Sequence, residues 1–456
     1  MADLDPDLDI TARLARSAAA VESPLTDLAG FDDWFAEYGQ QVYTTAERVP
    51  LAALHQWYET PVTGDLRHRS GKFFTVHGLR VHDPGNAVPW WDQPIIDQPE
   101  VGILGILVKE FDGVPHCLMQ AKAEPGNPGG LQLSPTVQAT RSNYTGVHKG
   151  KPVPYLDYFR DTSRHRVIAD VRQSEQGAWF HRKRNRNIAV ETTEEVEVLE
   201  GFRWFTLGQL YLLLARDDIV NMDARTVLAC LPHASRAEGA LHRTTDVLSW
   251  LTGARSLATV SVERIALKAL DEWRHTEMGY SHESGGFFDV IGVSVTAAGR
   301  EVGRWCQPMI EPHGTGVIAF LTREIGGAPH VLMHARTEPG YADVVELAPT
   351  VQCVPASYAW LPPAARPRHL DEVLAAGPDR IRFEALLSEE GGRFFHARNR
   401  YLIVDSDVPE DPGHPDYRWL SLDQLTRLLS HSHYLNVQAR SLVACLRGLE
   451  ATRSVR

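Results

Sequence analysis

The sequence has few cysteines and no long apolar run, and both shortages exclude classes of protein. Its five cysteines never form a CxxC pair, which argues against a disulfide framework or a cysteine-rich zinc site and favours a reducing cytoplasm. The longest apolar run, residues 101–108, is far short of the roughly 20 residues that a membrane helix needs. The N-terminus MADLDPDLDI lacks the basic and apolar regions of a secretory signal. We therefore expect a cytoplasmic protein that does not enter a membrane.

Motifs that bind common cofactors are missing too. No GxGxxG follows a predicted strand, because Gly314-Thr315-Gly316 lacks the third glycine. The phosphate loop GxxxxGK[ST], the zinc motif HExxH and the nucleophile motif GxSxG are also absent. The 20 histidines show no spacing typical of metal ligands. We expect acid–base chemistry with no cofactor and no metal.

Excess positive charge is lacking as well. The chain has 46 basic and 58 acidic residues and a net charge of −12, whereas nucleic-acid-binding proteins normally show a basic surface. We expect no nucleic-acid partner. A small anionic ligand stays compatible with this charge, because a local basic pocket can lie in an acidic protein.

An internal duplication organises the 456 residues. Residues 107–126 align without gaps to residues 321–340, with more than half of the positions identical. At nearly the same offset, the PTVQ and RNR motifs and the segment NMDARTVLACL all find counterparts. A match that keeps its register this long indicates duplication of a whole domain. We predict an N-terminal helical extension over 1–45, a first repeat over 46–240 and a second over 241–456.

Each repeat reads as α+β. Amphipathic patterns predict a first helix at 48–59 and its counterpart at 261–273. Short β-branched and apolar runs separated by Gly and Pro predict strands, and their short connections favour an antiparallel or mixed sheet. Two helical segments close each repeat, the second of which carries NxxAR. We interpret the Asn and Arg of that motif as a structural clamp, and the Gly of the repeated EPG as a turn position.

Several polar side chains are candidates for a ligand site. Lys122 and Glu124 share one face of a predicted strand, which is either solvated or lines a pocket. Arg184 and Arg186 also share a face, where they would bind phosphate oxygens or pair with nearby carboxylates. A tryptophan such as Trp57 or Trp179 would stack on a nucleobase, although core packing is the commoner role.

The segment QAKAEPGNPGGLQLSPTVQATRSNYTGVHKG (120–150) resembles the signature of the NDP-hexose 2,3-dehydratases, as do WYET near 57, SGKFF at 70–74 and the NxxAR helix. The resemblance extends over nearly the whole chain. It implies two tandem duplicated Nudix-like domains, each a mixed sheet with flanking helices, and a homodimer without cofactors. The chain has no Nudix box, so the pyrophosphohydrolase activity and its Mg²⁺ site are not expected here.

The resemblance also implies a lyase that dehydrates dTDP-4-keto-6-deoxyglucose for deoxysugar and natural-product (antibiotic) biosynthesis. Such an enzyme needs a base at C3, an electrophile at O4 and an acid at the C2 hydroxyl. A 3-ketoreductase would then act on the 3,4-diketo product. The candidates for catalysis are Lys122, Glu124, Tyr144 and His148; those for substrate binding are Trp57, Gln138, Asn143, Trp179, Arg184 and Arg186.

The two repeats differ after PTVQ. Asn143 of the first repeat aligns with Ser357, and His148 aligns with Pro362. We hypothesise that the first repeat holds the catalytic pocket and the second a remnant. The candidate residues of this second pocket are Trp273, Arg336, Gln352, Tyr358, Arg398 and Arg400. Two other functions stay open: another nucleotide-sugar enzyme such as a hydrolase, and a non-catalytic nucleotide-sugar-binding scaffold.

This asymmetry is testable. His148→Ala and Tyr144→Phe should each lower turnover of the nucleotide sugar, since both remove a polar group of the first repeat. His334→Ala, in the second repeat, should leave turnover unchanged. The opposite pattern would assign catalysis to the second repeat.

Overall fold

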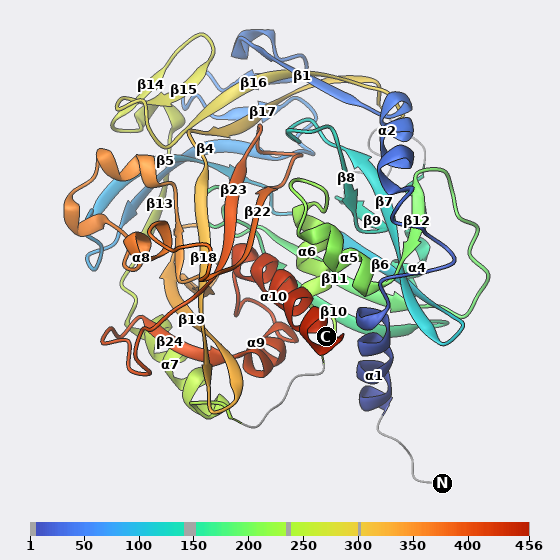
Figure 1. Ribbon diagram of the computed structural model, residues 1–456. Coiled ribbons are helices and arrows are strands. Elements are labelled where there is room, and N and C mark those ends of the chain that lie inside the picture. Colours follow the sequence, from blue (N-terminus) through green and yellow to red (C-terminus); the bar gives the residue numbers. More distant parts are fainter. Residues whose placement is uncertain (1–5, 141–151, 234–238, 300–301, 456) are drawn as a thin grey trace.

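The computed structural model describes residues 6–140, 152–233, 239–299 and 302–455, and each repeat contributes one large sheet and most of one small sheet (Figure 1). The large sheet of the first repeat has seven strands in the order β10-β11-β6-β7-β12, with β8 on β7 and β9 on β6. Their bounds are β6 Gly102–Phe111, β7 Val114–Ala123, β8 Leu131–Ser134, β9 Val137–Ala139, β10 Arg166–Ser174, β11 Arg184–Glu191 and β12 Phe202–Phe205. The β6–β11 pair is parallel and the others are antiparallel, so the predicted mixed sheet is confirmed.

The second repeat builds the same sheet from β18, β19, β20, β21, β22, β23 and β24. Their bounds are β18 Gly316–Ile325, β19 Ala328–Thr337, β20 Val345–Ala348, β21 Val351–Cys353, β22 Ile381–Ser388, β23 Arg398–Asp405 and β24 Tyr417–Ser421. Again one pair, β18–β23, is parallel. The two large sheets therefore share a topology, as the duplication predicts.

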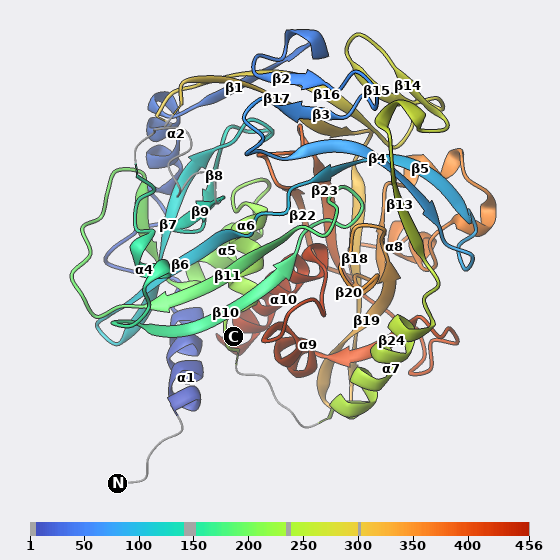
Figure 2. The same cartoon turned by 180° about the vertical axis from the view of Figure 1, so that it is seen from behind.

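The two small sheets exchange a strand between the repeats. Strand β1 (Thr44–Val49) pairs with β16 (Phe288–Ala297) of the second repeat, while β13 (Ser261–Ile265) pairs with β4 (Thr75–His82) of the first. Strands β1 and β16 lie across the top of the molecule in both views, with β4 and β13 below them (Figure 2). The remaining strands are β2 Trp57–Glu59, β3 Leu66–His68, β5 Trp90–Asp97, β14 Trp273–His275, β15 Gly279–His282 and β17 Arg304–Pro312.

This exchange overturns one sequence prediction. The helices expected at 48–59 and 261–273 are absent, and each segment is instead a strand end, a short 3₁₀ turn (Leu51–Ala53, Leu267–Ala269) and a second strand. The apolar spacing was real, but strand pairing with a segment about 200 residues away outweighs local helix preference. A local pattern contains no information about such a distant partner.

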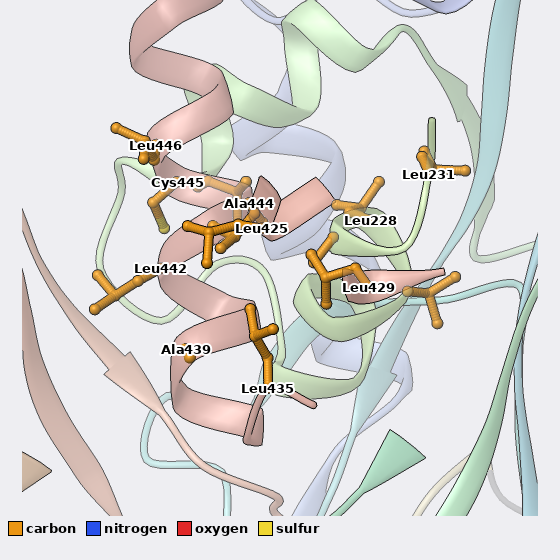
Figure 3. Close-up of a cluster of buried hydrophobic side chains, with 14 of the residues drawn as sticks. Leu228, Leu231, Leu425, Leu429, Leu435, Ala439, Leu442, Ala444, Cys445 and Leu446 are labelled. Carbon is orange, nitrogen blue, oxygen red and sulfur yellow. The ribbon is translucent and has the colours of Figure 1, made fainter. Parts of the chain in front are cut away.

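The closing helices are confirmed. They are α5 (Leu207–Leu214) and α6 (Met222–Ala229) in the first repeat, and α9 (Leu422–Leu429) and α10 (Val437–Val455) in the second. Capping boxes start α5 and α9, and an asparagine side chain caps α6. Helix α10 lies at the centre of the molecule (Figure 1), where its leucines belong to the same buried cluster as Leu228 and Leu231 of the first repeat (Figure 3). One hydrophobic core therefore spans both repeats.

The outer helices complete this core. Helix α1 (Pro6–Ala19) packs on α5 and β7 of the first repeat through its buried side chains Ile10 and Leu14. Helix α2 (Phe31–Gln41) buries Phe31. The other helices are α4 Asp157–Arg160, α7 Thr244–Leu257 and α8 Leu370–Leu374, with 3₁₀ turns at Pro355–Ala359 and Pro363–Ala365. Among the described helices, none is long and apolar enough to cross a membrane.

The NxxAR arginines join the repeats reciprocally. Arg225 of α6 is fully buried and donates to Ser441 Oγ at 3.1 Å and to Ser388 O at 2.6 Å, both in the second repeat. Arg440 of α10 is equally buried and donates to Thr226 Oγ1 at 2.5 Å and to Ser174 O at 2.6 Å, both in the first. The expected structural clamp is confirmed, and its partners lie across the duplication.

The EPG glycines have a related task. A Cβ on Gly126 would lie 1.8 Å from Phe394 O, and one on Gly340 would lie 1.8 Å from Phe180 O. Each glycine N–H donates to a carbonyl of the other repeat, namely Gly391 O at 2.7 Å and Gly177 O at 2.8 Å. These glycines thus allow close backbone contact between the repeats, beyond the turn that the sequence predicted.

Arg440→Met should lower the melting temperature strongly. It leaves buried acceptors of both repeats without a donor, at about 1–3 kcal/mol each. Arg427→Met is the control, because Arg427 is 59% exposed and, among the described residues, pairs only with Asp423 of its own helix, a contact of about 0.5 kcal/mol or less. Thermal unfolding measures both variants. Equal melting temperatures would contradict the clamp.

Candidate active site

A cavity of about 460 Å³ lies between the first repeat and the second repeat, a size typical of small-molecule sites. The large sheet of the first repeat supplies Lys122, Gln138 and Asn185, and its small-sheet region supplies Trp57, His68, Phe73 and Phe74. Residues from β17 and from the loop before β23 close it: Arg304, Trp305, Cys306, Gln307, Glu390, Gly392 and Arg393. Both repeats therefore build this one site.

A chain of polar contacts fixes the carboxylate of Glu124 in the cavity wall. Lys122 Nζ lies 3.5 Å from Glu124 Oε1, which also accepts a hydrogen bond from Gln138 Nε2 at 2.9 Å. Gln138 is held in turn by Asn221 Nδ2, which donates to its Oε1 at 3.2 Å. Because Asn221 caps α6, the sheet and the helix position this acid–base pair together. Strand β7 ends at Ala123, so Glu124 directly follows it, and its contact with Lys122 shows that the two side chains lie on the same side, as the sequence predicted.

Three further carboxyl groups line the same cavity: Glu175, Asp223 and Glu390. The pKa of Glu390 is raised to about 7, chiefly by burial and in part by the nearby charge of Glu124, against the opposing effect of Arg393. Burial also raises the pKa of Asp223 well above its usual value, aided by the charges of Glu175 and Glu390. Such groups hold a proton near neutral pH, which suits general acid catalysis.

Positive charge balances this cluster. Burial lowers the pKa of Lys183 to about 8 while Glu175 opposes the change, and Lys183 Nζ donates to Glu100 O. Arg393 stacks on the Phe74 ring at 4.3 Å and donates to Gln98 Oε1 at 3.1 Å. The side chains of Lys122, Lys183, Arg304 and Arg393 make the cavity suitable for an anionic ligand.

The structure brings together only part of the sequence-predicted set. Lys122, Glu124, Gln138 and Trp57 line the cavity, and Trp57 Nε1 donates to Cys306 O at 2.8 Å across the repeats. Asn143, Tyr144 and His148 lie outside the described residues. Trp179 does not line the cavity; its ring packs against those of Phe394 and Phe288.

The two arginines expected to bind pyrophosphate lie elsewhere. Arg186 forms a two-point ion pair with Asp170, at 2.7 Å for both contacts, and donates to Phe159 O. Arg184 faces His433 and Asp343 of the second repeat, and burial lowers its pKa. Neither lines the cavity. The placement of Arg186 fits the ion-pairing interpretation that the sequence left open, with Asp170 as its partner.

The second repeat keeps the same relay around a tyrosine. Arg336 Nε and Gln352 Nε2 each donate to Glu338 Oε1 at 2.9 Å, and Asn436 donates to Gln352. Tyr341, which replaces Asn127 of the first repeat, is buried there, and its OH accepts from Asn436 at 3.0 Å. A Cβ on Gly177 would clash with the Tyr341 ring at 2.5 Å, so this ring fills space beside the relay.

The other second-pocket candidates make structural contacts. Trp273 Nε1 donates to Asp92 O at 2.8 Å, mirroring Trp57. Arg398 pairs with Asp218 of the first repeat at 2.5 Å, and Arg400 pairs with Glu384 at 2.5 Å. Burial raises the pKa of Tyr358.

Sequence reasoning missed the residues where the aligned repeats differ. Glu390 aligns with Gln176, Asp223 with Gln438 and Lys183 with Ala397. Each charged member lines the cavity. These exchanges of charge at matched positions were visible in the alignment of the two repeats, but only the fold shows that they converge. Arg304 and Arg393 differ in the same way, since they align with Trp90 and Trp179.

Comparison with known proteins agrees with this duplicated architecture. A sequence model described as NDP-hexose 2,3-dehydratase matches residues 28–231 and again residues 244–446. The chain belongs to this family. A relative from Amycolatopsis orientalis is 49% identical over 97% of the chain and 95% of its own length, and one from Saccharopolyspora spinosa is 48% identical over 97% and 96%. A third, from Streptomyces violaceoruber, is 50% identical over 93% and 98%.

All three relatives are named dTDP-4-dehydro-6-deoxy-alpha-D-glucopyranose 2,3-dehydratase. Both copies of the family match contain the NxxAR helix, whose arginine joins the two repeats. Each of the two matched ranges therefore includes one of the arginines through which the repeats are joined.

The raised pKa of Glu390 predicts a stability effect with a definite sign. Between pH 4.5 and about 7 the folded state holds this proton more tightly than the unfolded state, so stability falls as pH rises. Glu390→Gln, which installs the side chain found at Gln176, should raise the melting temperature at pH 8 by about 2 °C or more. It should have little effect at pH 4.5. A constant difference from pH 4.5 to 8 would contradict the raised pKa.

Proposed function

We propose that this NDP-hexose 2,3-dehydratase acts on dTDP-4-keto-6-deoxy-D-glucose, eliminates the C2 hydroxyl as water and yields a 3,4-diketo-2,6-dideoxy sugar nucleotide. The observation that carries the proposal is a cavity that combines an oriented carboxylate and ammonium, Glu124 and Lys122, with a carboxyl group of pKa about 7, Glu390. Elimination beside a ketone needs these three kinds of group. The names of the three relatives supply the substrate.

The first step is removal of the C3 proton. The C4 ketone acidifies this proton, and Glu124 accepts it in the proposal, because Gln138 and Lys122 favour its ionised form. The electron pair moves to O4, where the Lys122 ammonium stabilises the developing enolate. A hydrogen-bonded carboxylate beside an ammonium group suits both tasks.

The second step breaks the C2–O bond. Glu390 donates its proton to the departing hydroxyl, which leaves as water, and the enolate electrons form the C2=C3 double bond. The resulting enol carries its hydroxyl on C3 and tautomerises to the 3,4-diketone, so the reaction is redox-neutral. Tyr144 and His148, the other acid–base candidates of the sequence, remain part of the proposal as alternative proton donors.

Substrate binding uses the rest of the wall. Arg304 and Arg393 are suited to the pyrophosphate, since guanidinium groups make bidentate contacts with phosphate oxygens. Trp57, His68, Phe73 and Phe74 form an aromatic surface for the thymine ring. Asn143 completes the set proposed from the sequence. This arrangement moves the anion-binding role from Arg184 and Arg186 to the second repeat.

The finer features implied by the family resemblance belong to the same proposal. Each large sheet with its closing helices would be a Nudix-like domain, and the second-repeat pocket would be a remnant in which Tyr341 occupies the space beside the relay. The protein would be a cytoplasmic homodimer in a natural-product pathway. A 3-ketoreductase would consume the reactive diketone.

Isotope exchange separates the two proposed acid–base roles. In D₂O, Glu390→Gln should still exchange the C3 proton of the substrate while losing C2 deoxygenation, whereas Glu124→Gln should lose both. Each variant should lower kcat by about 10²–10⁴, the usual contribution of a positioned acid or base. Nuclear magnetic resonance follows exchange, and a coupled 3-ketoreductase assay follows deoxygenation.

Glu338→Gln is the matched control, because Glu338 holds the place of Glu124 in the second repeat. It should keep turnover close to wild type. Loss of turnover in Glu338→Gln with full turnover in Glu124→Gln would overturn the assignment of the catalytic repeat. Release of thymidine monophosphate would favour a hydrolase, and tight binding without turnover would favour a scaffold.

A further inference from the structure

A second cluster of chemically suited side chains lies behind the cavity wall. His77 on β4, Asp97 at the end of β5 and His181 in the loop before β11 place one potential ligand atom each within 4.8 Å of one another. His77 is completely buried. The three residues come from separate segments of the first repeat, and only the fold brings them together.

The hydrogen bonding of His77 determines which of its ring nitrogens is available. Nδ1 lies 2.9 Å from Gly78 O and must carry the proton, because a carbonyl oxygen only accepts. When the ring is neutral, Nε2 carries a lone pair and lies 3.8 Å from Asp97 Oδ2. Nε2 is buried and has no hydrogen-bond partner among the described residues. A cation held between these two atoms would be bound by both.

We propose that His77, Asp97 and His181 bind a divalent transition-metal ion of the zinc type, with His77 Nε2 and the Asp97 carboxylate as two of its ligands. Two imidazoles and one carboxylate form a ligand set that such ions use, and a ligating histidine commonly donates its other N–H to a backbone carbonyl. The His77–Gly78 contact already provides that donation.

Positive charge on Arg182 and Arg264 opposes the ion and limits the affinity. Arg264 of β13, the exchanged strand, has Nη1 3.6 Å from Asp97 Oδ2. Its Nη2 lies 3.3 Å from Asp65 Oδ2, and this second carboxylate neutralises part of the guanidinium charge. The same arginine–carboxylate pair recurs in the second repeat as Arg48 and Glu311. There, however, Ile291 and Phe395 hold the places of His77 and His181.

This difference indicates that the two histidines do more than build the fold. The second repeat builds the same strand pairing with apolar residues, so the fold itself does not require the two histidines. The ion would tie the loop that carries Phe180 and Lys183, both cavity residues, to β5. A backbone bridge between Ile96 and Phe180 already brings these segments side by side. The proposed role is therefore to position the cavity wall, independent of the reaction assigned to the cavity.

The test uses the full-length protein and metal alone. Protein purified without chelators should retain about one zinc ion per chain by elemental analysis. After chelation, Co²⁺ titration should give a saturable visible absorption band, and Zn²⁺ should raise the melting temperature. His181→Phe and His77→Ile install the residues of the second repeat and should each weaken Co²⁺ binding at least about 10-fold. Asp97→Asn should weaken it as well.

His313→Ala is the matched control, because His313 Nε2 lies 3.2 Å from Asp289 Oδ2 without a second histidine; it should bind Co²⁺ like wild type. His181 is only half-buried, so His181→Phe should fold, with a metal-free melting temperature close to that of chelated wild type. No retained ion together with no saturable Co²⁺ band in wild type would overturn the proposal. Equal Co²⁺ affinity in wild type and His181→Phe would overturn it too.

Discussion

The reciprocal burial of Arg225 and Arg440 is the constraint on which the rest of the structure depends. Each guanidinium reaches out of its own repeat and satisfies a strand-end carbonyl of the other, Ser388 O or Ser174 O. A buried guanidinium is tolerated only when its donors are paired, so neither repeat can bury its NxxAR helix without the other. The duplicated units are therefore halves of one core, and not independent domains.

The cavity follows from this mutual dependence. The residues that directly follow Ser388 and Ser174 include Glu390 and Glu175, which line the cavity. The EPG turns approach the same loops closely enough that only glycine fits. The contact that joins the repeats thus also brings Glu390 of the second repeat toward Glu124 of the first. Burial there raises the pKa of Glu390, and repulsion from the Glu124 carboxylate adds to the shift.

Around the polar relay, the two repeats differ in individual side chains on a shared frame. The relay from asparagine through glutamine to glutamate is present in both. Around it, the exchange of Asn127 for Tyr341 changes how much space is filled, and the exchange of Glu390 for Gln176 changes which relay faces an added carboxyl group. Duplication produced the same relay in both repeats, and the charge and volume of the neighbouring side chains distinguish the two copies.

The sequence alone determined the duplication, the mixed sheet, the closing helices and the pairing of Lys122 with Glu124 on one strand face. All of these depend on local pattern or on self-similarity. Only the tertiary structure decided that β1 and β13 are exchanged strands, that Arg186 pairs with Asp170 away from the cavity, and that His77, Asp97 and His181 meet. These features depend on contacts between distant segments, and a side chain's neighbours across such contacts are set by packing, which no local pattern records.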